Sequence, residues 1–183
     1  MNRTMIILFV ILLAISIGLI TLTVVSEGEG QGCKTSYPDK PTAKPRKTPL
    51  SELIKVLNPD DIIDQIILAI ALIEQPRGGY NFNYWGVHTD IGKWSYSDLI
   101  EYRICLRESI TGKTREYAGW SSVFNALKWM RKVIRQKYNN FLVKYGYFDF
   151  GRFYAEKWKG DKNVKSWWGE KFAQAGEMLK RRV

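Results

Sequence analysis

Residues 60–94 read DDIIDQIILAIALIEQPRGGYNFNYWGVHTDIGKW, and this stretch carries the strongest signals for the fold of the chain. An apolar helix is expected to begin at its N-terminal edge. Asn58 is a good N-cap residue, and Pro59 fits the first helical position. The acidic Asp60 and Asp61 then complement the positive end of the helix dipole.

The same helix should end near Gln75, because Pro76 and a Gly-Gly pair follow it. Residues 80–94 are rich in β-formers and small residues. That composition predicts a loop with a short hairpin directly after the helix.

Apolar residues at three- and four-residue spacing predict further helices downstream. The longest covers roughly residues 121–144, and shorter ones are expected at residues 99–110, 152–158 and 164–182. The predicted fold class is therefore mostly α, with a small β-hairpin, over residues 51–183.

The chain opens with an uncharged apolar run at residues 5–25. About 20 apolar residues in a helix cross the roughly 30 Å hydrocarbon layer of a bilayer. The run is longer than the ~7–15-residue apolar core of a cleaved signal peptide, and no A-x-A-like site follows it. We therefore predict an uncleaved signal-anchor at residues 1–25, which makes this a single-pass transmembrane protein.

A linker is expected at residues 26–50, where four prolines alternate with basic residues. Such a composition cannot bury a core, and it fits either an extended spacer or a disordered tail. Charges around the span leave the topology open: Arg3 favours a domain outside the cytoplasm, whereas Lys34 and Lys40 favour the reverse. An extracytoplasmic C-terminal domain is our working expectation.

The net charge of +10 and the pI near 9.6 predict attraction to polyanions such as nucleic acid, anionic lipid or anionic cell-wall polymers. A structural metal site is not expected, because His88 is the sole histidine and Cys33 and Cys105 stand alone. No cofactor is expected either. One disulfide is compatible with the sequence but cannot be inferred from it.

Glu74 is the most informative single residue. On a helix it continues an apolar stripe made of Ile63, Ile66, Ile67, Ile70 and Ala71. Apolar surroundings and the negative end of a helix dipole both favour a protonated carboxyl group. A protonated carboxyl is what a general acid needs in order to protonate a departing glycosidic oxygen. The competing interpretation is a solvent-exposed glutamate beside Arg77 at an ordinary helix end.

Rings and amides follow this glutamate at once. Aromatic faces bind the C–H surfaces of sugars, and amides bind their hydroxyls, so the mixture suits a glycan cleft. The candidate substrate-binding residues are Tyr80, Asn83, Tyr84, Trp85 and Gly86.

At this point the chain resembles the lysozyme-like superfamily, particularly its glucosaminidase-type murein hydrolases. Those enzymes carry a catalytic glutamate at the end of an apolar helix, followed by an Asn-x-aromatic-Gly-Ile/Val loop. Here residues 69–74 end the helix, and residues 83–87 match the loop. The resemblance implies that Glu74 is the general acid, that Asn83 and Trp85 line the substrate groove, and that a late tyrosine faces the glutamate. Tyr154 is the candidate for that tyrosine.

The chain also departs from this pattern, because many relatives follow the glutamate with Ser/Thr-Gly and this chain has Gln75-Pro76-Arg77. A glycosidase commonly needs a second carboxylate, unless an N-acetyl group of the substrate assists. Asp90 is the best candidate for it, although an ordinary turn residue is equally compatible. The weaker candidates, in charged stretches expected to be solvated, are Glu101, Glu108 and Glu116.

Three functions remain in competition. The first is a membrane-anchored glycosidase, either a lysozyme-like peptidoglycan hydrolase or a lytic transglycosylase, with an aminosugar polymer of the cell wall as substrate. The second is a non-catalytic structural or glycan-binding envelope protein with a lysozyme-like fold. Nucleic-acid binding ranks last, because no recognised nucleic-acid motif is present and the basic residues are scattered among acidic ones.

Overall fold

The computed structural model describes residues 39–89, 95–108 and 111–181. The chain divides into two compact units, residues 1–31 and 32–183, and every described residue belongs to the second. No helix within the described ranges is both long and apolar enough to cross a bilayer. The predicted anchor lies outside those ranges.

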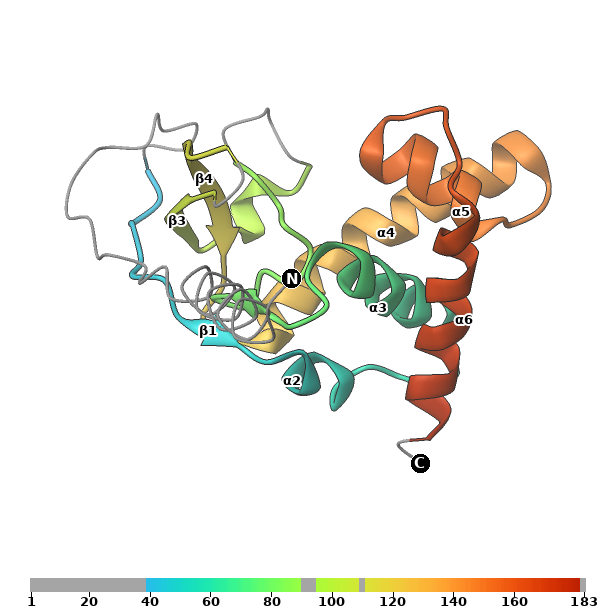
Figure 1. The fold of residues 1–183 in the computed structure, drawn as a ribbon, viewed down its shortest axis with the longest axis horizontal. Helices are drawn as coiled ribbons and strands as arrows, with labels where there is room; N and C mark the ends of the chain where they lie inside the picture. The colour runs from blue at the N-terminus through green and yellow to red at the C-terminus, as the bar shows by residue number, and fades with distance from the viewer. Residues whose placement is uncertain (1–38, 90–94, 109–110, 182–183) are drawn as a thin grey trace, which may run out of the picture. The chain divides into compact units, whose positions relative to one another are not determined.

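The domain is mostly helical with two small antiparallel sheets, as the sequence predicts (Figure 1). In chain order its elements are β1 (Lys47–Thr48), α2 (Leu50–Ile54), α3 (Ile62–Glu74), β2 (Gly79–Tyr80), the 3-10 helix η1 (Ser97–Leu99), β3 (Tyr102–Arg107), β4 (Thr114–Gly119), α4 (Val123–Tyr145), α5 (Phe150–Phe153), the π-helix η2 (Tyr154–Lys159) and α6 (Ser166–Lys180). β1 pairs with β2, and β3 pairs with β4.

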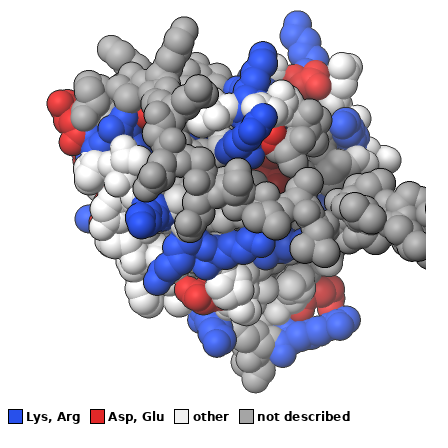
Figure 2. Space-filling view, turned by 60° about the vertical axis from the view of Figure 1, so that its left-hand side comes forward, with Lys and Arg blue, Asp and Glu red and all other residues white. Residues whose placement is uncertain are grey.

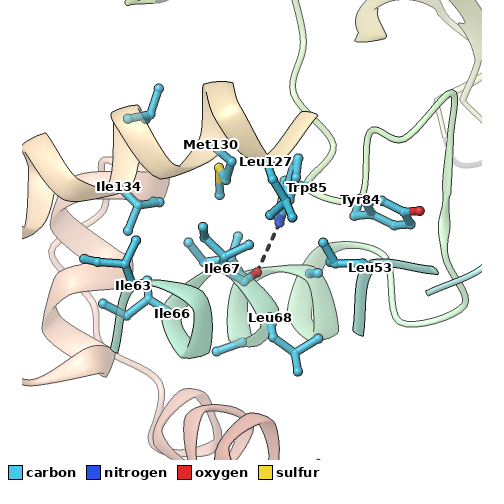
Figure 3. Close-up of a cluster of buried hydrophobic side chains, with 14 of the residues drawn as sticks. Leu53, Ile63, Ile66, Ile67, Leu68, Tyr84, Trp85, Leu127, Met130 and Ile134 are labelled. Carbon is cyan, nitrogen blue, oxygen red and sulfur yellow. Dashed lines mark hydrogen bonds between the residues drawn. The ribbon is translucent and has the colours of Figure 1, made fainter. Parts of the chain in front are cut away.

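Helix α3 is the core of the domain and packs against both α4 and α6 (Figure 1). Every residue from Ile66 to Leu72 is buried, because nearly the whole circumference of the helix is apolar. Figure 3 shows Ile63 directed toward Ile134 and Ile67 toward Met130, both of α4. The position of the C-terminal end of α3 is therefore fixed by packing along the whole helix.

The predicted start of this helix was wrong by about one turn. Asp61, not Asn58, is the N-cap, and its side chain accepts a hydrogen bond from the Ile63 N–H at 2.8 Å. Asn58 instead donates its backbone N–H to the buried carboxylate of Asp64 at 2.7 Å. Asp61 satisfies a free N–H of the first turn, so the helix begins after it. The predicted end near Gln75 is confirmed.

The helix predicted at residues 99–110 is also wrong. After η1 the chain forms strand β3, which pairs with β4 in a register running from Tyr102 opposite Gly119 to Arg107 opposite Thr114. Pairing with β4 satisfies the backbone of this segment and outweighs its weak helical preference. The hairpin is thus at residues 102–119, whereas the described part of the region where a hairpin was predicted, residues 80–89, is mainly loop.

The later helices follow the prediction closely. α4 and α6 occupy the two longest predicted segments, and Ser122 caps α4 by accepting the Asn125 N–H. The short helix predicted at residues 152–158 is present, but it begins at Phe150 as α5 and continues as the π-helix η2. A π-helix of this length is rare and is often found at functional sites.

Candidate functional site

Glu74 is the last residue of α3, and its side chain is 17% exposed. The helix ends here because Gln75 leaves helical geometry at φ −140° while its N–H still bonds the Ala71 carbonyl. The stripe of apolar residues below Glu74 is buried, with Ile70 and Ala71 fully inaccessible. A carboxyl group therefore stands at the boundary between the core and solvent.

Two donors from η2 meet the same carboxyl oxygen. The Tyr154 hydroxyl donates to Glu74 Oε1 at 2.5 Å, across 80 residues of sequence. The Lys159 ammonium forms an ion pair with the same oxygen at 2.8 Å. Glu74 Oε2 has no hydrogen-bond partner among residues 39–89, 95–108 and 111–181. The two carboxyl oxygens are therefore in different environments.

The π-helix explains how both donors reach one oxygen. Residues five positions apart, such as Tyr154 and Lys159, lie about 140° apart around an α-helix of ~3.6 residues per turn. A helix closed by i→i+5 hydrogen bonds turns more slowly and brings such a pair toward one face. Tyr154 was expected by resemblance to face Glu74, whereas Lys159 was not expected there, because α-helical spacing separates the two.

Tyr154 is held as a hydrogen-bond donor. Its ring is fully buried, packed edge-on against Trp168 at 4.6 Å and stacked with Phe150 at 6.0 Å between centroids. Burial, and then the hydrogen bond to Glu74 and its charge, raise the pKa of Tyr154 well above its ordinary value. The hydroxyl therefore keeps its proton at any physiological pH.

The loop after Glu74 is ordered mainly from within. Asn83 is buried, and its side-chain amide donates to the carbonyls of Val87 and Ala118 at 3.0 and 2.9 Å. Its carbonyl oxygen accepts the Val87 N–H at 3.0 Å. Trp85 is buried against α3 and donates its indole N–H to the Ile67 carbonyl at 3.1 Å. Both side chains are therefore buried and hydrogen-bonded to backbone groups of the domain, and they stabilise the loop.

The other loop candidates are placed similarly. Tyr84 is fully buried, which raises its pKa to about 12. Tyr80 is half-buried and belongs to β2. Gly86 adopts φ +63°, a conformation that favours glycine, so it permits the turn that leads to Val87.

The candidate second carboxylates have structural partners. The prediction that Glu116 is solvated was wrong: it is fully buried, accepts the Thr89 hydroxyl at 2.5 Å and pairs with Arg103 at 3.3 Å. Glu101 accepts the Ser121 N–H at 2.5 Å and the Asn125 side-chain amide at 2.7 Å, next to the start of α4. Glu108 pairs with Arg115 at 2.9 Å, and Asp90 lies outside the described residues.

Two hollows of the described surface lie away from the glutamate. One, of about 500 Å³, is lined by residues of α4, α5, η2 and the turn before α6. The other, of about 430 Å³, is lined by residues 43–46 together with Asn81, Phe82, Tyr102, Trp120 and Ser121. Neither includes Glu74. No group of three acidic, histidine or cysteine side chains among the described residues is arranged to hold a metal ion.

Comparison with known proteins gives no match: no family model, no curated protein and no solved structure is significantly similar to this chain.

Proposed function

We propose that this chain is a membrane-anchored glycosidase with a lysozyme-like domain, which cleaves an aminosugar polymer such as peptidoglycan. The observation that carries the proposal is the contact between Glu74 and Tyr154. A partly exposed carboxyl group at the end of an apolar helix is oriented by a buried tyrosine 80 residues away. The resemblance in sequence led us to expect this pairing of a helix-end glutamate with a late tyrosine.

In the proposed mechanism the two oxygens of Glu74 have different roles. Oε1 accepts from Tyr154 and pairs with Lys159, so a proton on the carboxyl group belongs on Oε2. In the proposed reaction Oε2 donates that proton to the glycosidic oxygen as the bond to the anomeric carbon breaks. Tyr154 and Lys159 act as positioning residues that hold the carboxyl group in one orientation.

The engaged state of Glu101, Glu108 and Glu116 favours a mechanism with one catalytic carboxylate. Participation of the substrate N-acetyl group can replace a second carboxylate. A lytic transglycosylase or a substrate-assisted hydrolase therefore fits the partners of these three glutamates.

The second candidate function is a non-catalytic envelope protein of the same fold. It is favoured by the burial of Asn83, Tyr84 and Trp85, whose side chains support the fold in this conformation. The separation of both hollows from Glu74 favours it too. If the protein is non-catalytic, the polar contact that joins α3 to η2, made by Glu74 with Tyr154 and Lys159, is structural.

An extracytoplasmic location is part of the proposal. Cys105 of β3 is disulfide-bonded, and disulfides persist mainly in oxidising compartments outside the cytoplasm. This disulfide supports a domain that lies on the outer side of the membrane.

The test uses residues 32–183, the compact unit with its own core. Glu74→Gln removes the transferable proton while keeping the size of the side chain. We expect it to reduce release of soluble fragments from purified murein by about 10²–10⁴-fold, with unchanged circular dichroism. Glu170→Gln, an exposed site on α6, is the matched control and should keep full activity.

Reducing ends and anhydro products are both measured, because a transglycosylase forms few new reducing ends. If the parent releases neither, murein cleavage is wrong and the non-catalytic function stands. If Glu74→Gln is as active as the parent, Glu74 is not the general acid.

A further inference from the structure

Residues 40–48, here called the strap, were predicted to be part of a free linker but are bound to the domain. At its N-terminal end the strap pairs with β3 in parallel, through Thr42 and Arg103. The Arg103 N–H donates to the Pro41 carbonyl at 2.9 Å, and the Ala43 N–H donates to the Arg103 carbonyl at 2.8 Å. The Arg103 guanidinium also donates to the Lys40 carbonyl at 2.6 Å.

The C-terminal end of the strap is held by the loop that follows Glu74. Asn81 accepts the Arg46 N–H on its side-chain oxygen at 2.7 Å, donates its side-chain amide to the Lys44 carbonyl at 3.2 Å, and donates its own N–H to the Arg46 carbonyl at 2.8 Å. β1 then pairs with β2. The strap backbone is thus fixed along most of its length.

Three basic side chains of the strap, Lys44, Arg46 and Lys47, are available to another partner. The strap holds four basic residues and no acidic one. Lys44, Arg46 and Lys47 are exposed, and none of them forms an ion pair with a described residue. Arg46 rests over the Phe82 ring at 5.2 Å, which restrains its guanidinium. Figure 2 turns this side of the domain forward and shows long basic side chains crossing it.

We propose that the strap is a docking surface for an anionic lipid bilayer. Three cations on a fixed backbone make a pre-arranged site for headgroup phosphates, at little cost in chain entropy on binding. A flexible linker of the same composition would have to be ordered first.

The position of the strap in the chain selects lipid over a soluble polyanion. The predicted span ends at Val25, and the strap begins at Lys40. Fifteen residues reach at most about 50 Å, so Lys40 stays within that distance of the end of an anchored span. Such a tether gives a high effective concentration of headgroups, at which weak individual contacts suffice. This inference rests on the membrane anchor of the proposed function and is independent of any catalytic role for Glu74.

The experiment compares two triple variants of residues 32–183, which lack the predicted span. Lys44→Gln/Arg46→Gln/Lys47→Gln neutralises the strap and leaves its backbone contacts in place. Lys128→Gln/Lys132→Gln/Arg135→Gln removes the same charge from exposed residues of α4. Both are checked by circular dichroism and titrated with phosphatidylcholine vesicles that do or do not contain phosphatidylglycerol.

We expect the strap variant to lose on the order of 100-fold in partitioning onto the phosphatidylglycerol vesicles, from three headgroup contacts. The α4 variant should lose less than a few-fold, and neutral vesicles should bind neither protein. Equal losses in both variants would reduce the effect to net charge and overturn the proposal. So would strap-dependent binding to soluble polyglutamate as tight as to the vesicles.

Discussion

At the scale of single residues, Glu74 and Tyr154 show how a buried hydroxyl can orient an acid. Two donors meet Oε1, whereas no described residue donates a hydrogen bond to Oε2. Tyr154 keeps its proton because burial and the neighbouring carboxylate both disfavour tyrosinate. The Tyr154 hydroxyl therefore remains a hydrogen-bond donor to Glu74 at physiological pH.

The titration of Tyr154 can be measured directly. Its ring-carbon NMR signal should stay unchanged at the pH near 10.0 where an ordinary tyrosine is half-ionised, because the pKa of Tyr154 is raised. Glu74→Gln should lower the pKa of Tyr154 while leaving it above 10.0, since burial remains the largest cause. Tyr154→Phe identifies the signal. A Tyr154 signal that titrates with the exposed tyrosines would contradict the buried contact.

Asn83 is a second residue with a defined role, which is to stabilise the loop that follows Glu74. Its side chain serves the backbone groups of Val87 and Ala118, which have to be satisfied because they are buried.

We expect Asn83→Ala to lower the free energy of unfolding by about 3 kcal/mol, because it leaves several buried polar groups unpaired. Urea denaturation measures the change. Asn139→Ala, on the exposed face of α4, should stay within about 0.5 kcal/mol of the parent. If Asn83→Ala changed the free energy of unfolding as little as Asn139→Ala, the side chain of Asn83 would not be what stabilises the loop.

At the scale of elements, one buried charge joins helices α3 and α4. Asp64 of α3 is fully buried, and its oxygens accept from the Arg131 side chain of α4 at 2.7 and 2.5 Å. The Arg131 side chain is 37% exposed. The pair is therefore asymmetric: loss of the arginine strands a buried carboxylate, whereas a freed arginine can turn toward water.

Arg131→Met should accordingly lower the free energy of unfolding by about 3 kcal/mol, the lower end for a broken buried pair. Arg135→Met, one turn further along α4 and without an ionic partner among the described residues, should change it by less than about 0.5 kcal/mol. Thermal or urea unfolding of both variants makes the comparison. Equal effects would show that the ion pair between Asp64 and Arg131 does not stabilise the fold.

At the scale of the whole molecule, the chain has a net charge of +10, and its basic residues differ in whether they have an ionic partner within the domain. Several basic residues are engaged within the domain, such as Arg103 with Glu116 and Lys159 with Glu74. Lys44, Arg46 and Lys47 of the strap are exposed and form no ion pair with a described residue, so their charge is available to an external partner. The disulfide at Cys105 is also a property of the whole molecule. Disulfides persist mainly in oxidising compartments, so this bond favours folding of the domain outside the cytoplasm.

Thiol labelling of the intact chain tests the compartment. The chain has two cysteines, and none of the described ones is free. We expect no uptake of a maleimide before reduction and two equivalents after it, measured by mass spectrometry on protein taken directly from the membrane. Labelling of Cys105 without a reductant would contradict an extracytoplasmic domain.

The sequence by itself determined the features that depend on near neighbours. The apolar run into Glu74 predicted α3 and its end, and the long periodic segments predicted α4 and α6, because i, i+3 and i+4 spacing is local. The expectation that a late tyrosine faces Glu74 came from resemblance, and Tyr154 does lie there.

Only the tertiary structure decided the rest, and the reason is the same in each case. Residues 102–107 become a strand because β4 pairs with them, and the strap is ordered because Arg103 and Asn81 bind its backbone. Lys159 reaches Glu74 because η2 is a π-helix. These outcomes depend on partners far away in sequence or on a rare helical geometry, which local propensity and α-helical periodicity do not encode.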